Sequence, residues 1–193
     1  MTTLLDWFGR NGYLAVFLAV GLELVGIPFP AETILLTAGA TAATGRLSLP
    51  AVMVLAAVAA VLGASIGYTI GWVGGRPLLD RLVARGWPRQ QQLLRVEGFV
   101  HRHGGKALVT ARFVPFVRIF APWMAGASRM PVRRFAVWNI AGGVAWVVVV
   151  TLCGYLFAAS VGAIEQALGP GAAIAVAAVA VGAFIWHRVR RHD

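Results

Sequence analysis

The sequence Glu23-Leu24-Val25-Gly26-Ile27-Pro28-Phe29-Pro30-Ala31-Glu32 separates two apolar runs, residues 13–27 and 33–44. Proline lacks a backbone N–H and disfavours helical backbone at the residue before it, so Pro28 and Pro30 must interrupt a helix here. The first run is also shorter than the roughly 20 residues that a membrane-spanning helix needs. We therefore predict a hairpin of two half-helices that enters and leaves a membrane by the same face.

The composition of the whole chain supports a membrane location. Of its 193 residues, 59% are hydrophobic and 12% are charged, whereas an average soluble domain carries about 25% charged residues. A soluble fold of this size could not bury so much apolar surface, but a bilayer removes the need to bury it. The fold class expected is therefore all-α and integral to the membrane.

The net charge of +10 has a different meaning in a membrane protein than in a soluble one. The basic residues cluster between and after the apolar runs, where they set orientation and meet anionic lipid head groups. We expect no nucleic-acid partner, because no nucleic-acid-binding motif is present.

The single cysteine, Cys153, excludes an intramolecular disulfide and a structural zinc site, and neither a metal nor a cofactor is expected. Residues 1–12 contain Asp6 and lack a strongly basic region, so they do not resemble a cleaved signal peptide.

Residues 51–73 are apolar and long enough to cross the bilayer. Glycine recurs at every fourth position through and just beyond this run, which places a close-packing stripe on one helix face: Gly63, Gly67, Gly71 and Gly75. Residues 76–106 are basic and contain interspersed apolar side chains, which predicts interfacial amphipathic helices on the cytoplasmic side.

A second interrupted apolar element follows over residues 107–128, and it contains Arg112, Pro115, Arg118 and Pro122. We take Pro115 and Pro122, like Pro28 and Pro30, as residues that break the hairpin helices. Residues 135–158 should cross the membrane. The link over 160–169 lacks Lys and Arg and suits the outside, and residues 171–187 should cross back to a basic, cytoplasmic C-terminus.

The two interrupted elements are related by a single offset of 87 residues without a gap. The pairs in this register are Pro28-Phe29 with Pro115-Phe116, Ala38-Gly39-Ala40 with Ala125-Gly126-Ala127, Arg46 with Arg133, and Gly67-Tyr68 with Gly154-Tyr155. Such self-similarity indicates a duplicated unit. Unit one covers about residues 12–75 and unit two about 107–158, joined by the amphipathic linker 76–106 within one membrane domain, 1–193.

A hairpin followed by one crossing helix makes the second unit enter from the opposite face. This is an inverted repeat, as in many secondary transporters. Interrupted helices at membrane depth persist only where protein or water satisfies their backbone groups. We therefore expect the two hairpin tips to meet near the midplane and to line a polar cavity.

Four charged residues lie in otherwise apolar membrane segments: Glu23, Glu32, Arg112 and Arg118. A charge at the centre of a membrane helix costs about 2.5–3.5 kcal/mol on insertion scales, so these residues need partners. In the 87-residue register Arg118 falls opposite Ala31, beside Glu32, which predicts that Glu32 and Arg118 meet. Two interpretations stay open: a structural salt bridge, or a binding site in which guanidinium groups hold a phosphate and the carboxylates titrate.

These residues also carry a likeness to a known family. Three motifs carry it: Glu23 with Pro28-Phe29-Pro30-Ala31-Glu32; the run of Gly63, Gly67-Tyr68 and Gly71; and Arg112-Phe113-Val114-Pro115 with Arg118 and Ala125-Gly126, followed by Phe135, Asn139, Gly142 and Trp146. In these motifs the sequence resembles the DedA family, also called the SNARE-associated or VTT family. The likeness covers roughly residues 10–160. The sequence departs from the family's usual pattern at Ala64-Ser65-Ile66, where an Asp is frequent, and at Trp72 and Phe116.

The resemblance implies two opposed re-entrant hairpins and the transport or scrambling of lipids. Bacterial members are linked to recycling of undecaprenyl phosphate and to proton-coupled behaviour. By position, Glu23 and Glu32 match the family's acidic residues, and Arg112 and Arg118 match its paired arginines. The expected protein is thus a multi-pass protein of the bacterial cytoplasmic membrane that moves a phosphate-bearing lipid between leaflets, with proton coupling and homo-oligomerisation left open.

Three alternatives remain: a broad-specificity phospholipid scramblase, an intramembrane lipid hydrolase and a structural membrane scaffold. Residues 63–67 match the G-x-S-x-G pattern of serine hydrolases, but that motif requires a strand–turn–helix context and a histidine partner. Here the motif falls inside a predicted crossing helix, and all four histidines lie in basic flanking segments. We therefore expect no enzymatic activity.

Overall fold

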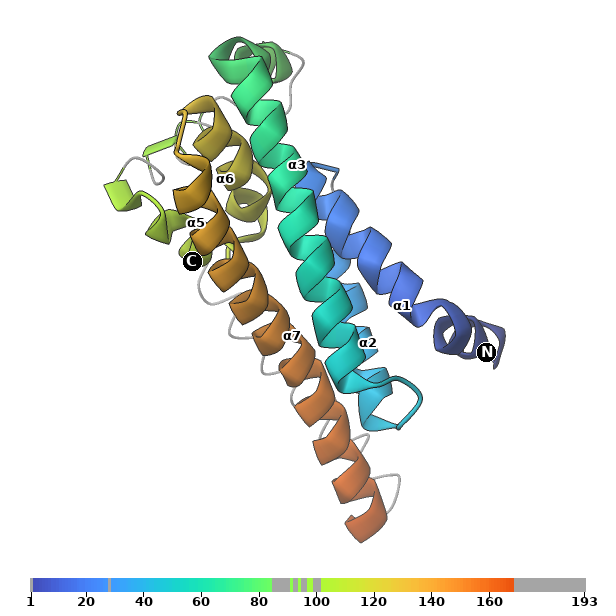
Figure 1. Ribbon diagram of the computed structural model, residues 1–193. Coiled ribbons are helices and arrows are strands. Elements are labelled where there is room, and N and C mark those ends of the chain that lie inside the picture. Colours follow the sequence, from blue (N-terminus) through green and yellow to red (C-terminus); the bar gives the residue numbers. More distant parts are fainter. Residues whose placement is uncertain are drawn as a thin grey trace.

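The structure is a computed structural model that describes residues 2–27, 29–84, 91, 94, 97–98 and 102–168. Its labelled helices are α1 (Thr2–Val25), α2 (Ala31–Ala43), α3 (Leu49–Ala84), α5 (Lys106–Ala111), α6 (Pro115–Ala127) and α7 (Val132–Leu168) (Figure 1). No strand occurs within these described ranges, so the all-α prediction is confirmed. The crossing helix predicted over 171–187 and much of the linker 76–106 lie outside the described residues.

Two helices have the length and composition to cross a bilayer. Their apolar parts are Leu49–Gly75 in α3 and Val132–Val161 in α7, which contain the predicted spans 51–73 and 135–158. At 1.5 Å per residue each is about 40 Å long or more, which exceeds a hydrocarbon core of about 30 Å. The two helices run side by side in opposite directions, and the shorter helices pack around them (Figure 1).

Both predicted helix interruptions are present. α1 ends at Val25 and α2 begins at Ala31, with Pro30 at the N-cap and Gly26 at a φ of 128° that glycine adopts easily. The second break lies between α5 and α6, where Val114 is extended. Pro115 is the first residue of α6, a position at which its missing N–H costs nothing and its fixed φ suits the helix. Pro28 itself lies outside the described residues.

Two residues behave differently from the sequence-based prediction. Pro122 does not break a helix, because α6 continues through it to Ala127. Pro122 is buried, and packing around it offsets the single backbone hydrogen bond that it removes. Gly75 is not a packing residue. It takes a φ of 55° and kinks α3, and a Cβ atom there would meet only the ring of Pro77.

The other three glycines of the predicted stripe allow close approach. A Cβ at Gly63 would meet the carbonyl oxygen of Gly21 in α1 at 2.5 Å. A Cβ at Gly67 would lie 2.8 Å from the indole ring of Trp123, and one at Gly71 would overlap the carbonyl oxygen of the same tryptophan. Small residues therefore let α1 and α6 lie directly on the backbone of α3.

The short helix of each hairpin packs mainly against the long helix of the other half: α2 against α7 and α6 against α3. A Cβ at Gly39 in α2 would overlap the carbonyl oxygen of Thr151 and crowd the backbone nitrogen of Tyr155 in α7. A Cβ at Gly126 in α6 would overlap the carbonyl oxygen of Tyr68 in α3. Gly39 and Gly126 are a pair at the 87-residue offset, and so are Tyr68 and Tyr155, so each of these glycines approaches the backbone of the tyrosine that corresponds to the other's neighbour.

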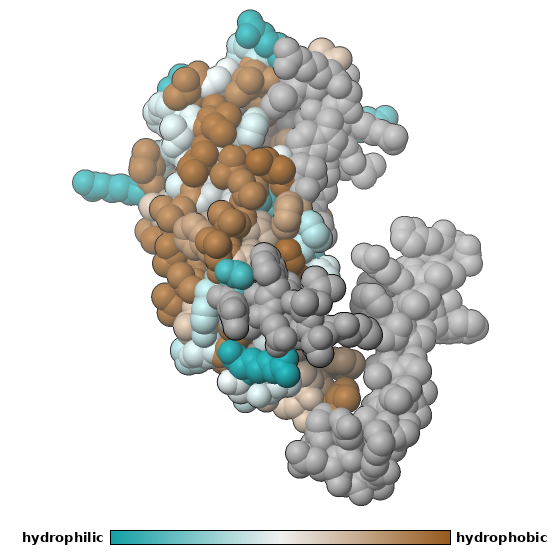
Figure 2. All heavy atoms as spheres, turned by 90° about the vertical axis from the view of Figure 1, so that its right-hand side faces the viewer, coloured by the Kyte–Doolittle hydropathy of each residue, from teal (hydrophilic) through white to brown (hydrophobic). Residues whose placement is uncertain are grey.

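The outer surface of the helices is apolar. Figure 2 shows a broad face of hydrophobic side chains with hydrophilic residues mainly near its margins. Among the exposed hydrophobic residues are Leu14, Leu18, Val54, Leu62, Val73, Val137 and Ile140. A soluble monomer rarely exposes so continuous an apolar surface, and hydrocarbon is its natural solvent.

Candidate functional site

Buried charges gather where the start of α6 meets the end of α1. Arg118, in the first turn of α6, donates from Nε to Oε1 of Glu23 at 2.9 Å and from Nη2 to the same oxygen at 2.5 Å. Both side chains are almost fully buried, at 4% and 5% exposure. The indole N–H of Trp123 also donates to the carbonyl oxygen of Val25 at 3.0 Å, so α6 is tied to the end of α1 by two independent contacts.

Glu23 also satisfies the start of α2. Its Oε2 accepts a hydrogen bond from the backbone N–H of Ala31 at 3.2 Å. Ala31 is the first residue of α2, where backbone N–H groups lack partners within the helix and the helix dipole is positive. One carboxylate therefore neutralises a guanidinium and caps a half-helix at the same time.

Glu32 is a weaker second partner of Arg118. Nη1 of Arg118 lies 3.4 Å from Oε2 of Glu32, and the Glu32 side chain is 46% exposed. The predicted meeting of Glu32 and Arg118 is therefore observed, but Glu23 makes the shorter and more buried contact. Glu23 is buried and also bonds the backbone N–H of Ala31, whereas nearly half of the Glu32 side chain is exposed.

A third partner of Arg118 comes from α7. The guanidinium carbon lies 4.9 Å from the centroid of the Trp146 ring, within the range of a cation–π contact. Trp146 is 2% exposed, so the interaction takes place away from solvent. Arg118 is thus held by two carboxylates and one aromatic face.

Arg112 has a contrasting environment. It is the C-cap residue of α5 and is 2% exposed. Its Nη2 donates to Oδ1 of Asn139, a neutral acceptor, and its Nη1 has no hydrogen-bond partner among the described residues. No carboxylate in the described part of the chain forms a salt bridge with it. Within the described residues, Arg112 therefore has a buried positive charge with no carboxylate partner.

Asn139 and Trp146 were not among the site residues expected from sequence. They lie on one face of α7, seven residues apart, with Gly142 and Gly143 between them. Asn139 bonds Arg112 and Trp146 faces Arg118, so one face of α7 contacts both arginines. The two α7 residues are about 10 Å apart along the helix axis. The sequence feature that could have identified them is one polar and one aromatic residue at helical spacing within an apolar run.

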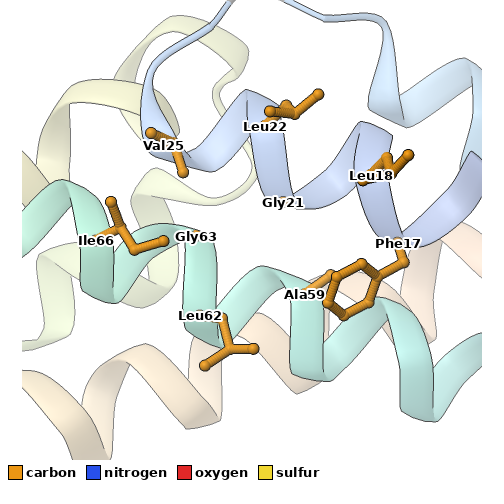
Figure 3. Close-up of a pocket in the computed structure, with 9 residues that line it drawn as sticks. All are labelled: Phe17, Leu18, Gly21, Leu22, Val25, Ala59, Leu62, Gly63 and Ile66. Atoms are coloured by element: carbon orange, nitrogen blue, oxygen red, sulfur yellow. The ribbon is translucent and has the colours of Figure 1, made fainter. Parts of the chain in front are cut away.

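An apolar groove between α1 and α3 lies apart from these charges (Figure 3). It measures about 230 Å³ and is lined by Phe17, Leu18, Gly21, Leu22, Val25, Ala59, Leu62, Gly63 and Ile66. Glu23 projects from the face of α1 opposite the groove, because successive helix residues are rotated by about 100° and the groove is lined by the residues on its other side. The groove therefore faces the surroundings of the helix pair and offers no polar group to a ligand.

The serine of the G-x-S-x-G pattern sits inside a continuous helix. Ser65 lies in the span of α3, and its Oγ donates to the carbonyl oxygen of Val61 at 2.7 Å. It also accepts a hydrogen bond from Asn139 at 3.4 Å. This setting lacks the strand–turn–helix geometry that exposes a nucleophilic serine. Among the described residues, no three His, Cys, Asp or Glu side chains are grouped so that they could hold a metal ion.

Comparison with known proteins places this arrangement in a family. The family model described as the VTT domain matches residues 29–156. The chain is 40% identical to the uncharacterized membrane protein slr0232 of Synechocystis sp., over 86% of this chain and 76% of the relative. It is 38% identical to Protein DedA of Escherichia coli K12, over 78% of this chain and 70% of the relative. No solved structure matches. The chain is therefore a membrane protein that belongs to the VTT-domain family, the family of the DedA proteins.

Proposed function

We propose that this protein is a lipid transporter that moves a phosphate-bearing lipid between the two leaflets of the bacterial cytoplasmic membrane. The observation that carries the proposal is the buried, uncompensated guanidinium of Arg112. An unpaired buried charge is costly, and such groups inside a membrane domain commonly mark a substrate path. A phosphate supplies the negative charge and the acceptor oxygens that Arg112 lacks.

Arg118 would be the second arginine that binds the lipid phosphate. Its ion pair with Glu23 and Glu32 keeps it neutralised when no lipid is bound, and the phosphate would compete with the more exposed Glu32 for the guanidinium. Arg112 and Arg118 thus take part in different ways: the first attracts the anion and the second exchanges partners. The acyl or prenyl tail would stay in hydrocarbon, beside the apolar outer face of the helices.

The membrane arrangement that we propose is a pair of re-entrant hairpins, α1–α2 and α5–α6, inverted across the bilayer as two copies of one unit. The approach of Gly39 to Tyr155 and of Gly126 to Tyr68 supports it, because a duplicated unit related by a two-fold axis brings equivalent residues together twice. The antiparallel course of α3 and α7 is consistent with it. The proposed C-terminal side is the cytoplasm, from the basic residues near that end.

In this arrangement transport proceeds by alternating access. The site at the meeting of the two tips opens to one leaflet and then to the other, while the halves rock against each other. Undecaprenyl phosphate is the proposed substrate, on the family resemblance and on its single phosphate. Protonation of Glu23 or Glu32 would release Arg118 to the lipid and couple transport to protons. No bond of the lipid is made or broken, so the proposed protein is not an enzyme.

The test is reconstitution into liposomes that carry either labelled undecaprenyl phosphate or labelled phosphatidylethanolamine. Exchange between leaflets is compared for the native protein, Arg112→Gln, Arg118→Ala and the control Arg133→Ala. Arg133 is exposed at the start of α7, so its removal controls for net charge. We expect the first two variants to lose undecaprenyl phosphate exchange by at least about tenfold, the worth of one charge-assisted hydrogen bond.

The other outcomes separate the alternatives. Equal exchange of both lipids by native protein would identify a broad phospholipid scramblase. Arginine variants that no longer elute as folded protein on gel filtration would indicate a structural scaffold. Native protein that exchanges neither lipid would overturn the proposal.

A further inference from the structure

The amide of Asn139 has an orientation that its neighbours determine. Arginine can only donate hydrogen bonds, so the atom of Asn139 that faces Nη2 of Arg112 must be the carbonyl oxygen Oδ1. The carbonyl oxygen of Val61 can only accept, so the atom 3.2 Å from it must be the amide nitrogen Nδ2. Asn139, itself 2% exposed, therefore joins α7 to the end of α5 and to the middle of α3.

The space beside Asn139 is shaped to the arginine. A Cβ atom at Gly142 would lie 3.0 Å from Cα of Val109 and 3.4 Å from Cγ of Arg112, and one at Gly143 would lie 3.7 Å from its Nη2. The side chain of Arg112 thus passes along the glycine face of α7 to reach the amide. Three helices, α5, α7 and α3, contribute residues to this contact.

The two arginines differ in the charge of the acceptor that holds them. Arg118 is held by the carboxylate of Glu23, which cancels its charge. Arg112 is held by an amide, which gives the same kind of N–H···O contact and leaves the charge in place. An aspartate has nearly the same shape as asparagine and would accept the same hydrogen bond. The identity of residue 139 therefore decides whether Arg112 is a neutralised or an available cation.

We infer that Asn139 is a specificity-determining residue, which selects lipids with a net-anionic head group over zwitterionic ones by orienting Arg112 without neutralising it. The inference rests on the proposed transport function. A net-anionic head group cancels the charge of Arg112, whereas the ammonium of a zwitterionic head group opposes that gain and must also be accommodated in a buried site. Asn139 acts through Arg112 and is a positioning residue for the head group.

The experiment compares exchange of labelled phosphatidylglycerol and labelled phosphatidylethanolamine with identical acyl chains, so that only the head group differs. Asn139→Asp is expected to lower phosphatidylglycerol exchange by about tenfold or more, the worth of one charge-assisted hydrogen bond, and to lower its ratio to phosphatidylethanolamine exchange. Asn139→Leu removes the acceptor and adds no charge. It is expected to lower the exchange of both lipids and to keep the native ratio.

A double variant shows whether the effect passes through Arg112. In an Arg112→Gln background, Asn139→Asp is expected to change the ratio no further, because no guanidinium remains to be neutralised. A ratio that Asn139→Asp leaves at the native value would overturn the inference, and so would an equal loss of ratio in Asn139→Leu. If Asn139→Asp does not fold, Arg112→Gln decides: a native ratio in that variant overturns the inference, because selection would not depend on the guanidinium that Asn139 orients.

Failure of this inference can be told apart from failure of the proposed function. Native protein that exchanges neither lipid removes the transport function and the inference with it. Native protein whose exchange depends on Arg112 but not on the charge at residue 139 removes the inference alone.

Discussion

Arg118 and Glu23 are 95 residues apart in sequence and form a buried ion pair that joins the first turn of α6 to the last turn of α1. The same carboxylate accepts the first N–H of α2, so the pair connects three helix ends. Its position helps to explain how two interrupted helices can end inside a membrane protein, because the first N–H of α2 bonds Glu23 of α1 and the carbonyl oxygen of Val25 at the end of α1 bonds Trp123 of α6.

Loss of the Glu23 carboxylate should destabilise the fold. Glu23→Gln leaves the guanidinium of Arg118 without its main buried counter-charge, and breaking a buried pair in this way costs about 3–5 kcal/mol. The matched control is Glu32→Gln, which should cost about 1 kcal/mol or less because the Glu32 side chain is half-exposed. Thermal unfolding in detergent measures both. Equal melting temperatures for the two variants would show that Glu23 does not stabilise the meeting of the tips.

Proton coupling should depend on Glu32. Glu32 shares Arg118 with Glu23 and is the more exposed of the two carboxylates, so water reaches it more readily. We expect exchange of undecaprenyl phosphate in liposomes to respond to an imposed pH gradient, and Glu32→Gln to lose that response while retaining exchange. Indifference of the native protein to the gradient would remove the coupling hypothesis and leave passive exchange.

The crosswise glycine contacts should be equally sensitive in the two halves. Gly39→Val and Gly126→Val each place a side chain against a carbonyl oxygen of the facing long helix, so both should destabilise the protein by about 1–3 kcal/mol or more. Gly21→Ala is the control, since a Cβ there lies 4.0 Å from its nearest neighbours. Thermal unfolding in detergent tests all three. A large effect in only one half would contradict equivalent packing.

Trp146 should contribute to the position of Arg118 beyond its apolar bulk. Trp146→Phe keeps a weaker aromatic face and Trp146→Leu keeps only volume, so lipid exchange should fall in the order native, Phe, Leu. The cation–π contact is worth about 2 kcal/mol when desolvated, or about thirtyfold in rate for the leucine variant. Similar rates for the two variants would assign Trp146 to packing alone.

The loops before the two long helices should lie on opposite sides of the membrane. α3 and α7 run in opposite directions, so Arg46, before α3, and Ser128, before α7, mark opposite ends of the helix pair. In a background with Cys153→Ser, Arg46→Cys should react with a membrane-impermeant maleimide from outside intact cells, and Ser128→Cys only after the membrane is opened. Labelling of both from the same side would refute the inverted arrangement.

Much of the architecture was predictable because it depends on local chemistry. Pro30 and Pro115 mark helix starts through their own backbone geometry, and the lengths of the runs ending at Gly75 and Val161 follow from apolar composition. The all-α membrane fold, both breaks and the encounter of Arg118 with Glu32 were expected from sequence, and the structure contains them. Pro122 shows the limit of the rule, because burial within α6 tolerates a proline that local preference alone would exclude.

Tertiary structure alone decided which charges are neutralised. Sequence grouped Arg112 and Arg118 as equals, because each is an arginine in an apolar segment near a proline. Their difference comes from partners far along the chain: the carboxylate of Glu23 reaches Arg118 across 95 residues, and the amide of Asn139 reaches Arg112 across 27. Acceptor charge and distance are properties of the folded contact and leave no trace in local pattern, whereas helix breaks and apolar length do.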